Sequence, residues 1–283
     1  LVFHVDGGWN SDISVSNIKS LISKLNLDLF TEVINWEEMR LFQLSFFKSG
    51  VPHIDIPQDH AFISTLYNYA NNNGIKWILN GGNVSTECIR NPLKYFYYGT
   101  DMKHIKYIRK KFGAKNMPTY PFSSILRHKV WLRYIKRVKV IKILDYIYYD
   151  KKKALNELVH HYGWKPYPRK HFESRFTRYY EGYWLPKRFG FDTRRVQLSS
   201  LIATNQISRE DALEQLSKPE FTDTEAESES RYIANKLRIS YEELMHYMFM
   251  PKKYYYDYPN SLSLFQKGAN FLQKVGLEAA IKR

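Results

Sequence analysis

The densest group of residues that could carry out chemistry lies within residues 163–181. Lys170, His171, Glu173 and Arg175 occur there among several aromatic residues. A lysine and an arginine flanking a histidine and a glutamate could bind phosphates, stabilise negative charge in a transition state and move protons. A salt-bridged helix on the protein surface would carry the same residues without any function. The pattern alone leaves both interpretations open.

A second group of candidate residues consists of two glycine pairs with polar neighbours. Each pair directly follows a short apolar run. The pairs and their polar neighbours are Asp6, Gly7 and Gly8, and then Asn80, Gly81, Gly82 and Asn83. Glycines let a backbone approach a ligand closely, and successive amides in such a turn can bind an anion. Glu87, four residues after Asn83, could bind Mg²⁺ or simply favour the positive end of a helix. On the pattern alone, ordinary turns explain the glycines better than a ligand site does.

Several classes of site are disfavoured by residues that the sequence lacks. The histidines show no metal-ligand spacing, and there is no G-x-S-x-G, G-x-x-x-x-G-K-[ST] or G-x-G-x-x-G motif. A single cysteine, Cys88, excludes an internal disulfide framework. The apolar runs are too short to span a bilayer, and the first residues do not resemble a signal peptide. We therefore expect a cytoplasmic protein with no transmembrane segment.

The positive charge is concentrated in one part of the chain. Residues 103–153 contain sixteen lysines and arginines against two acids, Asp145 and Asp150, and so carry +14 of the net charge of +15. Such a segment can bind nucleic acid, anionic lipid, nucleotide phosphates or an acidic protein, or it can be a solvated surface.

The elements that must position these residues alternate between strand and helix. Apolar runs predict strands at 1–6, 29–36 and 75–80, and helical spacing predicts helices at 13–25 and 59–73. This order predicts an α/β fold with a doubly wound, mostly parallel sheet. Ligands bind such sheets beyond the carboxyl ends of the strands, which is where both glycine pairs stand.

The character of the sequence changes near Thr119, after which the periodicity of the basic and apolar stretches fits neither helix nor strand clearly. We therefore expect two domains, an α/β nucleotide-binding domain over 1–118 and a mainly helical C-terminal region over 119–283. Beyond Leu198, capping-box patterns predict helix starts. These patterns pair Ser208 with Asp211, Thr224 with Glu227, and Ser240 with Glu243.

Three stretches together resemble a known family. FHVDGGWN, ILNGGNVSTE and the long block over residues 163–202 are similar to the bacterial N-acetyl sugar amidotransferases of the ATP-pyrophosphatase superfamily. The resemblance implies a Rossmann-like sheet. The phosphate loop that marks this superfamily is absent from the sequence, so we expect that the first βα unit is missing and that the nucleotide-binding domain is N-terminally incomplete.

The resemblance implies an ATP-dependent amidotransferase. It would convert the N-acetyl group of a nucleotide sugar into an acetamidino group through an adenylylated amide, releasing AMP and pyrophosphate. The expected cofactors are ATP and Mg²⁺, and the expected partners are glutaminase and cyclase-like subunits that supply ammonia. The product would enter a surface polysaccharide such as the O-antigen of lipopolysaccharide.

The resemblance also implies roles for individual residues. His4, Val5 and Asp6 would line the adenosine, Gly81, Gly82 and Asn83 would form the second nucleotide turn, and Glu87 would hold Mg²⁺. Lys170 and Arg175 would contact phosphates or AMP, and His171 and Glu173 would contact the sugar or transfer protons.

Two other functions remain open at this stage. The basic segment would suit an RNA-modifying member of the same superfamily. Such enzymes that transfer sulfur commonly need paired cysteines, and this sequence has one cysteine. A nucleic-acid partner is therefore less expected than a sugar nucleotide. A non-catalytic protein could instead use the basic, aromatic region at 119–153 to dock peripherally on an anionic membrane or on an acidic protein.

Overall fold

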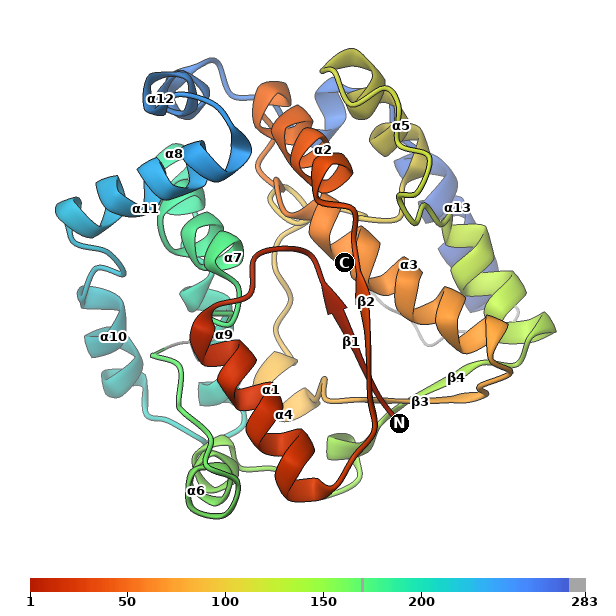
Figure 1. The fold of residues 1–283 in the computed structure, drawn as a ribbon, viewed down its shortest axis with the longest axis vertical. Helices are drawn as coiled ribbons and strands as arrows, with labels where there is room; N and C mark the ends of the chain where they lie inside the picture. The colour runs from red at the N-terminus through yellow and green to blue at the C-terminus, as the bar shows by residue number, and fades with distance from the viewer. Residues whose placement is uncertain (169–170, 275–283) are drawn as a thin grey trace.

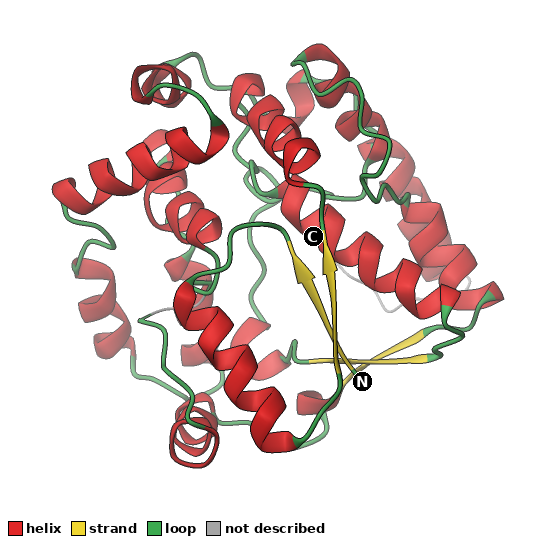
Figure 2. Ribbon diagram, viewed as in Figure 1, coloured by secondary structure: helices red, strands yellow, loops and turns green. Residues whose placement is uncertain are grey.

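The computed structural model describes residues 1–168 and 171–274 as a mixed α/β structure that is mostly helical (Figures 1 and 2). In the first part of the chain the elements are β1 (Val2–Asp6), α1 (Asp12–Leu25), β2 (Leu29–Val33), α2 (Trp36–Ser49), α3 (Ile56–Asn72), β3 (Trp77–Asn80), α4 (Val84–Glu87), α5 (Met102–Lys111), the π-helix η1 (Arg127–Ile135), β4 (Lys139–Lys142), the 3₁₀-helix η2 (Ile143–Asp145) and α6 (Lys151–Tyr162). They are followed by α7 (Arg175–Tyr179), the π-helix η3 (Tyr180–Trp184), α8 (Leu185–Phe189), α9 (Arg194–Ala203), α10 (Arg209–Ser217), α11 (Asp223–Leu237), α12 (Tyr241–Phe249), the 3₁₀-helix η4 (Tyr255–Asp257) and α13 (Leu262–Lys274).

The chain begins with a βαβ unit. Strand β1 pairs with β2 in parallel, from Val2 opposite Leu29 to Asp6 opposite Val33. Helix α1 connects them; the Ser11 side chain caps its first turn, and a left-handed residue follows its last. The strand–helix–strand order predicted for this region is confirmed.

The predicted single sheet is replaced by two separate sheets. Strand β3 pairs with β4, not with β1, in a second parallel pair that runs from Trp77 opposite Lys139 to Asn80 opposite Lys142. Figure 2 shows the two strand pairs running in different directions. The sequence pattern did not identify β4 because this short strand alternates lysines with valine and isoleucine inside a long basic stretch. β4 lies beyond residue 118, where we placed the domain boundary, and Val138 beside it packs against Ala70 and Ile78.

The core is built around α2. Met39, Phe42 and Phe46 recur at helical spacing on this helix and are fully buried, as is Phe47. The helix ends at Gly50, whose φ of +74° provides the left-handed conformation of its C-cap. Helices α5, α7 and α11 pack around this core. Helix α2 was not among the helices predicted from the sequence, although its apolar residues recur at helical spacing.

The C-terminal region is helical, as predicted. The capping box formed by Ser208 and Asp211 at the start of α10 is confirmed. The next helix begins at a capping box of Thr222 and Glu225, so the start predicted at Thr224 was two residues late. Among the residues that the structure describes, none of the helices combines the length and apolar character that a membrane crossing requires.

Candidate active-site cleft

A cleft of about 590 Å³ opens beside the carboxyl end of β1, between α3 and the segment that runs from residue 171 through α7 into η3. One side of it is apolar and includes Val5, Phe62 and Leu66. The other side is polar and carries several carboxyl groups. An apolar wall facing a few convergent polar groups is the usual form of a small-molecule site.

Backbone pairing brings two distant parts of the chain together at this cleft. The amide of Ser11 donates to the Glu173 carbonyl at 2.9 Å, and the amide of Arg175 donates to the Trp9 carbonyl at 3.0 Å. Asn10 and Ser174 form an antiparallel bridge between them. The loop after β1 and the start of α7 therefore form one wall.

Gly8 allows the β1 loop to take this path. Its φ of +83° is left-handed, and a Cβ at this position would lie 2.7 Å from the Trp36 ring. Asp6 stabilises the same turn, because its Oδ1 accepts a hydrogen bond of 2.7 Å from the Gly8 amide. This carboxylate is thus engaged in the turn beside the cleft.

The best candidate for proton transfer in the cleft is Asp55. The side chain is 3% exposed; Thr177 Oγ1 donates to its Oδ2 at 2.8 Å, and Gln58 Nε2 donates to its Oδ1 at 3.2 Å. Burial, followed by the negative charges of Asp59 and Glu181, raises the pKa of Asp55 well above its usual value. A carboxyl group with a raised pKa can give up or accept a proton closer to neutral pH.

His53 and Tyr180 provide polar atoms that no described residue satisfies. His53 is 6% exposed, and neither of its ring nitrogens has a hydrogen-bond partner within the described ranges; Nε2 lies 3.6 Å from Asp59 Oδ2. The hydroxyl of Tyr180 is also without a partner there, and this side chain is 1% exposed. Burial raises the pKa of Tyr180 well above its usual value, so the phenol is a neutral donor. Buried polar atoms of this kind are available to bind a ligand.

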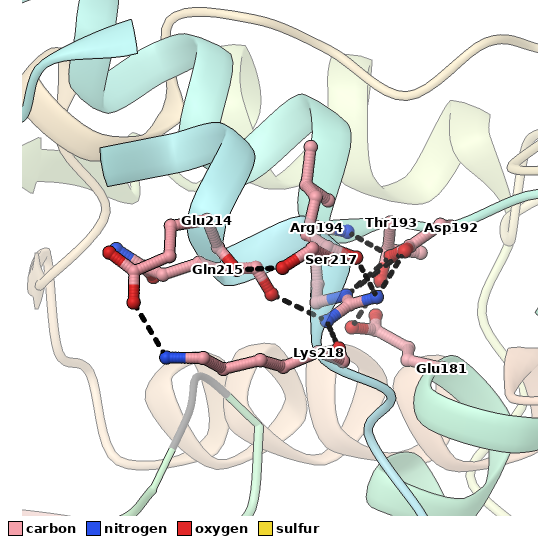
Figure 3. A network of polar contacts seen from close by, with 9 residues as sticks. Glu181, Asp192, Thr193, Arg194, Glu214, Gln215, Ser217 and Lys218 are labelled. Atoms are coloured by element: carbon pink, nitrogen blue, oxygen red, sulfur yellow. Dashed lines mark hydrogen bonds and ion pairs between the residues drawn. The ribbon is translucent and has the colours of Figure 1, made fainter. Parts of the chain in front are cut away.

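Glu181 is held in place by the segment that leads into α9. Its Oε2 accepts hydrogen bonds from Thr193 Oγ1 at 3.3 Å and from Gln197 Nε2 at 3.4 Å. Figure 3 shows how Arg194 fixes this segment: its guanidinium bonds Asp192 and reaches the backbone carbonyls at the end of α10. Helices α9 and α10 therefore help to position a carboxylate of the cleft.

The structure places four of the predicted site residues at the cleft: His4, Val5, His171 and Glu173. Nε2 of His4 lies 3.2 Å from the side-chain Nδ2 of Asn10, and Nδ1 of His171 lies 3.5 Å from Glu173 Oε1. His171 has a φ of +68°, a left-handed conformation that costs energy for a residue with a side chain. Such conformations are concentrated at functional sites.

Of the two predicted phosphate ligands, Arg175 is the one that the structure describes. Lys170 lies outside the described residues. The Arg175 guanidinium points to α11, where Nη2 bonds Glu229 Oε1 at 2.8 Å and the guanidinium carbon stacks 3.4 Å from the centre of the Tyr232 ring. Arg175 does not line the cleft, and its observed partners are those of a structural residue that joins α7 to α11.

The second glycine turn is not part of the cleft. Asn80 Oδ1 accepts from the Gly82 amide at 2.6 Å, and Asn83 caps α4 by accepting from the Thr86 amide at 2.8 Å. Helix α4, which follows this turn, packs on α9, and Gly81 likewise does not line the cleft. Because β3 and β1 belong to different sheets, their carboxyl ends do not form the shared edge that we expected.

Glu87, the predicted Mg²⁺ ligand, lies beside the same turn. Its Oε2 is 3.3 Å from where a Cβ on Gly82 would stand, and Cε of Lys142 is 3.7 Å from that point. A neighbouring ammonium group would compete with a metal for this carboxylate. Within residues 1–168 and 171–274, no group of three or more histidine, cysteine or acidic side chains could hold a metal ion.

Sequence reasoning missed the polar residues contributed by the loop after α2 and the first turn of α3. His53, Asp55 and Asp59 come from VPHIDIPQDH, a short stretch in which histidines and acids interrupt apolar residues next to two prolines. Charged residues within an otherwise apolar stretch indicate either a buried polar site or a surface loop. That signal was present in the sequence but was not specific.

Comparison with known families gives one match. Residues 173–271, about a third of the chain, match the family described as LPS biosynthesis protein WbpG-like, C-terminal domain. This region extends from Glu173 in the cleft wall through most of α13. The C-terminal part of the chain therefore resembles the C-terminal domain of an LPS biosynthesis protein. No curated protein matches the chain.

Proposed function

We propose that this chain takes part in an ATP-dependent amidotransferase that converts the N-acetyl group of a nucleotide sugar into an acetamidino group for lipopolysaccharide. The match of residues 173–271 to an LPS biosynthesis family supports the pathway. The resemblance of 163–202 to N-acetyl sugar amidotransferases supports the reaction. Ammonia would come from glutaminase and cyclase-like partner subunits.

The observation that carries the proposal is the composition of the cleft. The matched region contributes Glu173, Thr177, Tyr180 and Glu181, the βαβ unit contributes His4 and Val5, and α3 contributes further apolar residues. Strand β1 and the loop after it, whose FHVDGGWN sequence resembles the sugar amidotransferases, thus meet the start of the matched C-terminal region at a single cleft.

The residues that line the cleft suit a sugar or a nucleoside better than a polyphosphate. The apolar wall suits a planar base or the faces of a sugar ring, and His53 and Tyr180 offer hydrogen bonds to an amide. Within the described residues, the lining includes no lysine or arginine, and carboxyl groups face the space. These residues do not fit the triphosphate of ATP or its Mg²⁺, so both cofactors are part of the proposal on the resemblance alone.

We assign the following roles to residues of this chain. Tyr180 and His53 bind the N-acetyl group of the sugar. Both side chains are buried, the Tyr180 hydroxyl has no partner among the described residues, and the charged group near the His53 ring is Asp59, 3.6 Å from Nε2. Asp55 takes a proton from the nitrogen nucleophile as the new C–N bond forms. Thr177 and Gln58 hold the Asp55 carboxyl group in position.

The test uses the complete protein with ATP, Mg²⁺, ammonium chloride and a panel of nucleotide sugars that carry N-acetyl groups. We expect AMP and pyrophosphate to form only when both sugar and ammonium are present, and mass spectrometry to show nitrogen in place of the amide oxygen. The Asp55→Asn variant should lower kcat by about 10²–10³, the usual loss on removing a general base. The exposed Glu214→Gln is a matched control for loss of a carboxylate.

The pH profile separates a role in proton transfer from a purely structural one. Because the pKa of Asp55 is raised, the carboxylate is protonated at low pH, and kcat of the wild type should rise with pH through that raised pKa. The Asn variant should lose this acidic limb. Formation of ADP, or unchanged kcat and pH profile in Asp55→Asn, would contradict the proposal.

A further inference from the structure

Helix α5 presents a row of lysines on the side opposite the core. Lys103, Lys106 and Lys110 recur at intervals of three and four residues and are exposed, whereas His104 and Ile108 on the other side are buried. A shallow groove of about 480 Å³ runs along these lysines. None of the described residues that line it is acidic, so its positive charge is not neutralised locally.

Helix α13 is fixed beside the start of α5. Asp101, the N-cap of α5, uses its Oδ2 to accept a hydrogen bond of 2.6 Å from the Ser261 amide and one of 2.5 Å from the Tyr255 hydroxyl. The rings of Tyr98 and Phe265 pack at 5.0 Å. Pro259, just before α13, lines the lysine groove. The two helices therefore belong to one surface.

The outer side of α13 is apolar and basic. Leu264 and Phe271, seven residues apart, are 65% and 63% exposed. Lys267 and Lys274 lie at helical spacing on the same side. Exposed leucine and phenylalanine between lysines are typical of a helix that lies in a membrane interface.

We propose that this surface binds the anionic surface of a phospholipid membrane. We define it as the α5–α13 face, made of Lys103, Lys106, Lys110, Lys111, Leu264, Lys267, Phe271 and Lys274. The lysines pair with anionic headgroups, and Leu264 and Phe271 enter the boundary between headgroups and acyl chains. A nucleic acid would match the lysines, but its phosphate backbone offers no apolar contact for Leu264.

The experiment measures co-flotation of the chain with vesicles. Vesicles of phosphatidylcholine alone are compared with vesicles that also contain phosphatidylglycerol. We expect binding only to the second kind, and weaker binding in high salt, because the screening length falls from about 30 Å at 0.01 M to about 3 Å at 1 M ionic strength. Equal binding to both kinds, or binding to neither, overturns the proposal.

Variants identify the surface. Lys106→Glu with Lys110→Glu should weaken binding by about thirtyfold or more, given the contribution of each lysine near anionic lipid. Leu264→Ser with Phe271→Ser should weaken binding in low and in high salt alike.

The matched control is Lys152→Glu with Lys153→Glu, which makes the same change of charge on exposed positions of α6. In Figure 1, α6 lies at the opposite side of the molecule from α5. An equal loss in this control, or no loss in the α5 or α13 variants, shows that the α5–α13 face is not the binding surface. Binding of a duplex RNA in place of vesicles also overturns the proposal. Melting monitored by circular dichroism verifies that each variant is folded.

Discussion

At the scale of single residues, burial sets the protonation of His104. The side chain is fully buried, its Nε2 lies 3.2 Å from the Tyr97 hydroxyl, and the rings of Tyr97 and Tyr255 pack against it. Burial lowers the pKa of His104 to about 4. The folded protein therefore keeps this histidine neutral in a range where the unfolded chain, with a pKa near 6.5, is protonated.

This difference predicts a loss of stability in acid. Between about pH 6.5 and pH 4, His104 is protonated in the unfolded state and neutral in the folded state. The contribution of His104 to the free energy of unfolding therefore falls by about 3 kcal/mol as the pH decreases through this range. In His104→Gln this part of the pH dependence should disappear. Urea unfolding at several pH values measures it, with His246→Gln on the surface of α12 as the control. Parallel curves for wild type and His104→Gln would contradict the prediction.

At the scale of elements, Arg188 joins three helices. It lies on α8, is 3% exposed, and donates to the carbonyls of Met248 at 2.5 Å, Met250 at 2.9 Å and Pro251 at 3.3 Å. Nη2 also reaches the carbonyl of Gly50, the C-cap of α2, at 3.5 Å. One guanidinium thus satisfies carbonyl groups at the ends of both α2 and α12.

Replacing Arg188 with Met should therefore leave several buried acceptors unsatisfied. We expect a loss of about 1.5–3 kcal/mol in the free energy of unfolding, the range for hydrogen bonds that involve a charged group. Lys187→Met, at the exposed neighbouring position, should change stability little. Chemical denaturation of both variants measures the difference. Similar losses in the two variants would show that the hydrogen bonds of Arg188 contribute little.

The sequence predicts a helix or strand correctly where residues that are close in the chain determine it. The strand–helix–strand order of the first 33 residues follows from apolar runs and from apolar residues at helical spacing, and Ser240 caps α12 as its sequence pattern predicts. The pairing of β3 with β4 depends on contacts between residues about sixty positions apart, and the lysine-rich β4 has no apolar run of its own. Local patterns carry no information about such pairing.

The same distinction applies to the cleft. His171 and Glu173 could be identified because they lie in one dense polar block with a family resemblance. The contribution of Asp55 could not, because its importance comes from Thr177, more than a hundred residues away, and from burial that only the folded chain provides. Nothing in the sequence indicated that Glu229 would be the partner of Arg175, because the two residues are more than fifty positions apart.

At the scale of the whole molecule, Trp9 connects the N-terminal unit to the helical region. It is 1% exposed, and its Nε1 donates to Gln43 on α2 at 2.8 Å. Its ring packs against Phe176 on α7 at 5.0 Å, and the ammonium of Lys236 on α11 lies 4.8 Å from its centre. Elements from both ends of the chain thus meet on one indole.

Trp9→Ala should accordingly destabilise the entire fold. We expect a loss of about 3–5 kcal/mol, as for other large aromatic residues removed from a core. Trp77→Ala removes the same side chain from β3, where it is 56% exposed, and should cost much less. Thermal melting compares the two variants. A melting temperature for Trp9→Ala no lower than that for Trp77→Ala would contradict this view of the core.

The left-handed backbone of His171 has a consequence for protein engineering. Glycine adopts this conformation freely, so a library screened only for folding would accept glycine at position 171 as readily as histidine. Such a screen would discard the imidazole beside Glu173 without registering any loss. We therefore expect stabilised versions of this chain to need a selection for activity alongside the selection for folding, because folding alone does not distinguish histidine from glycine at this position.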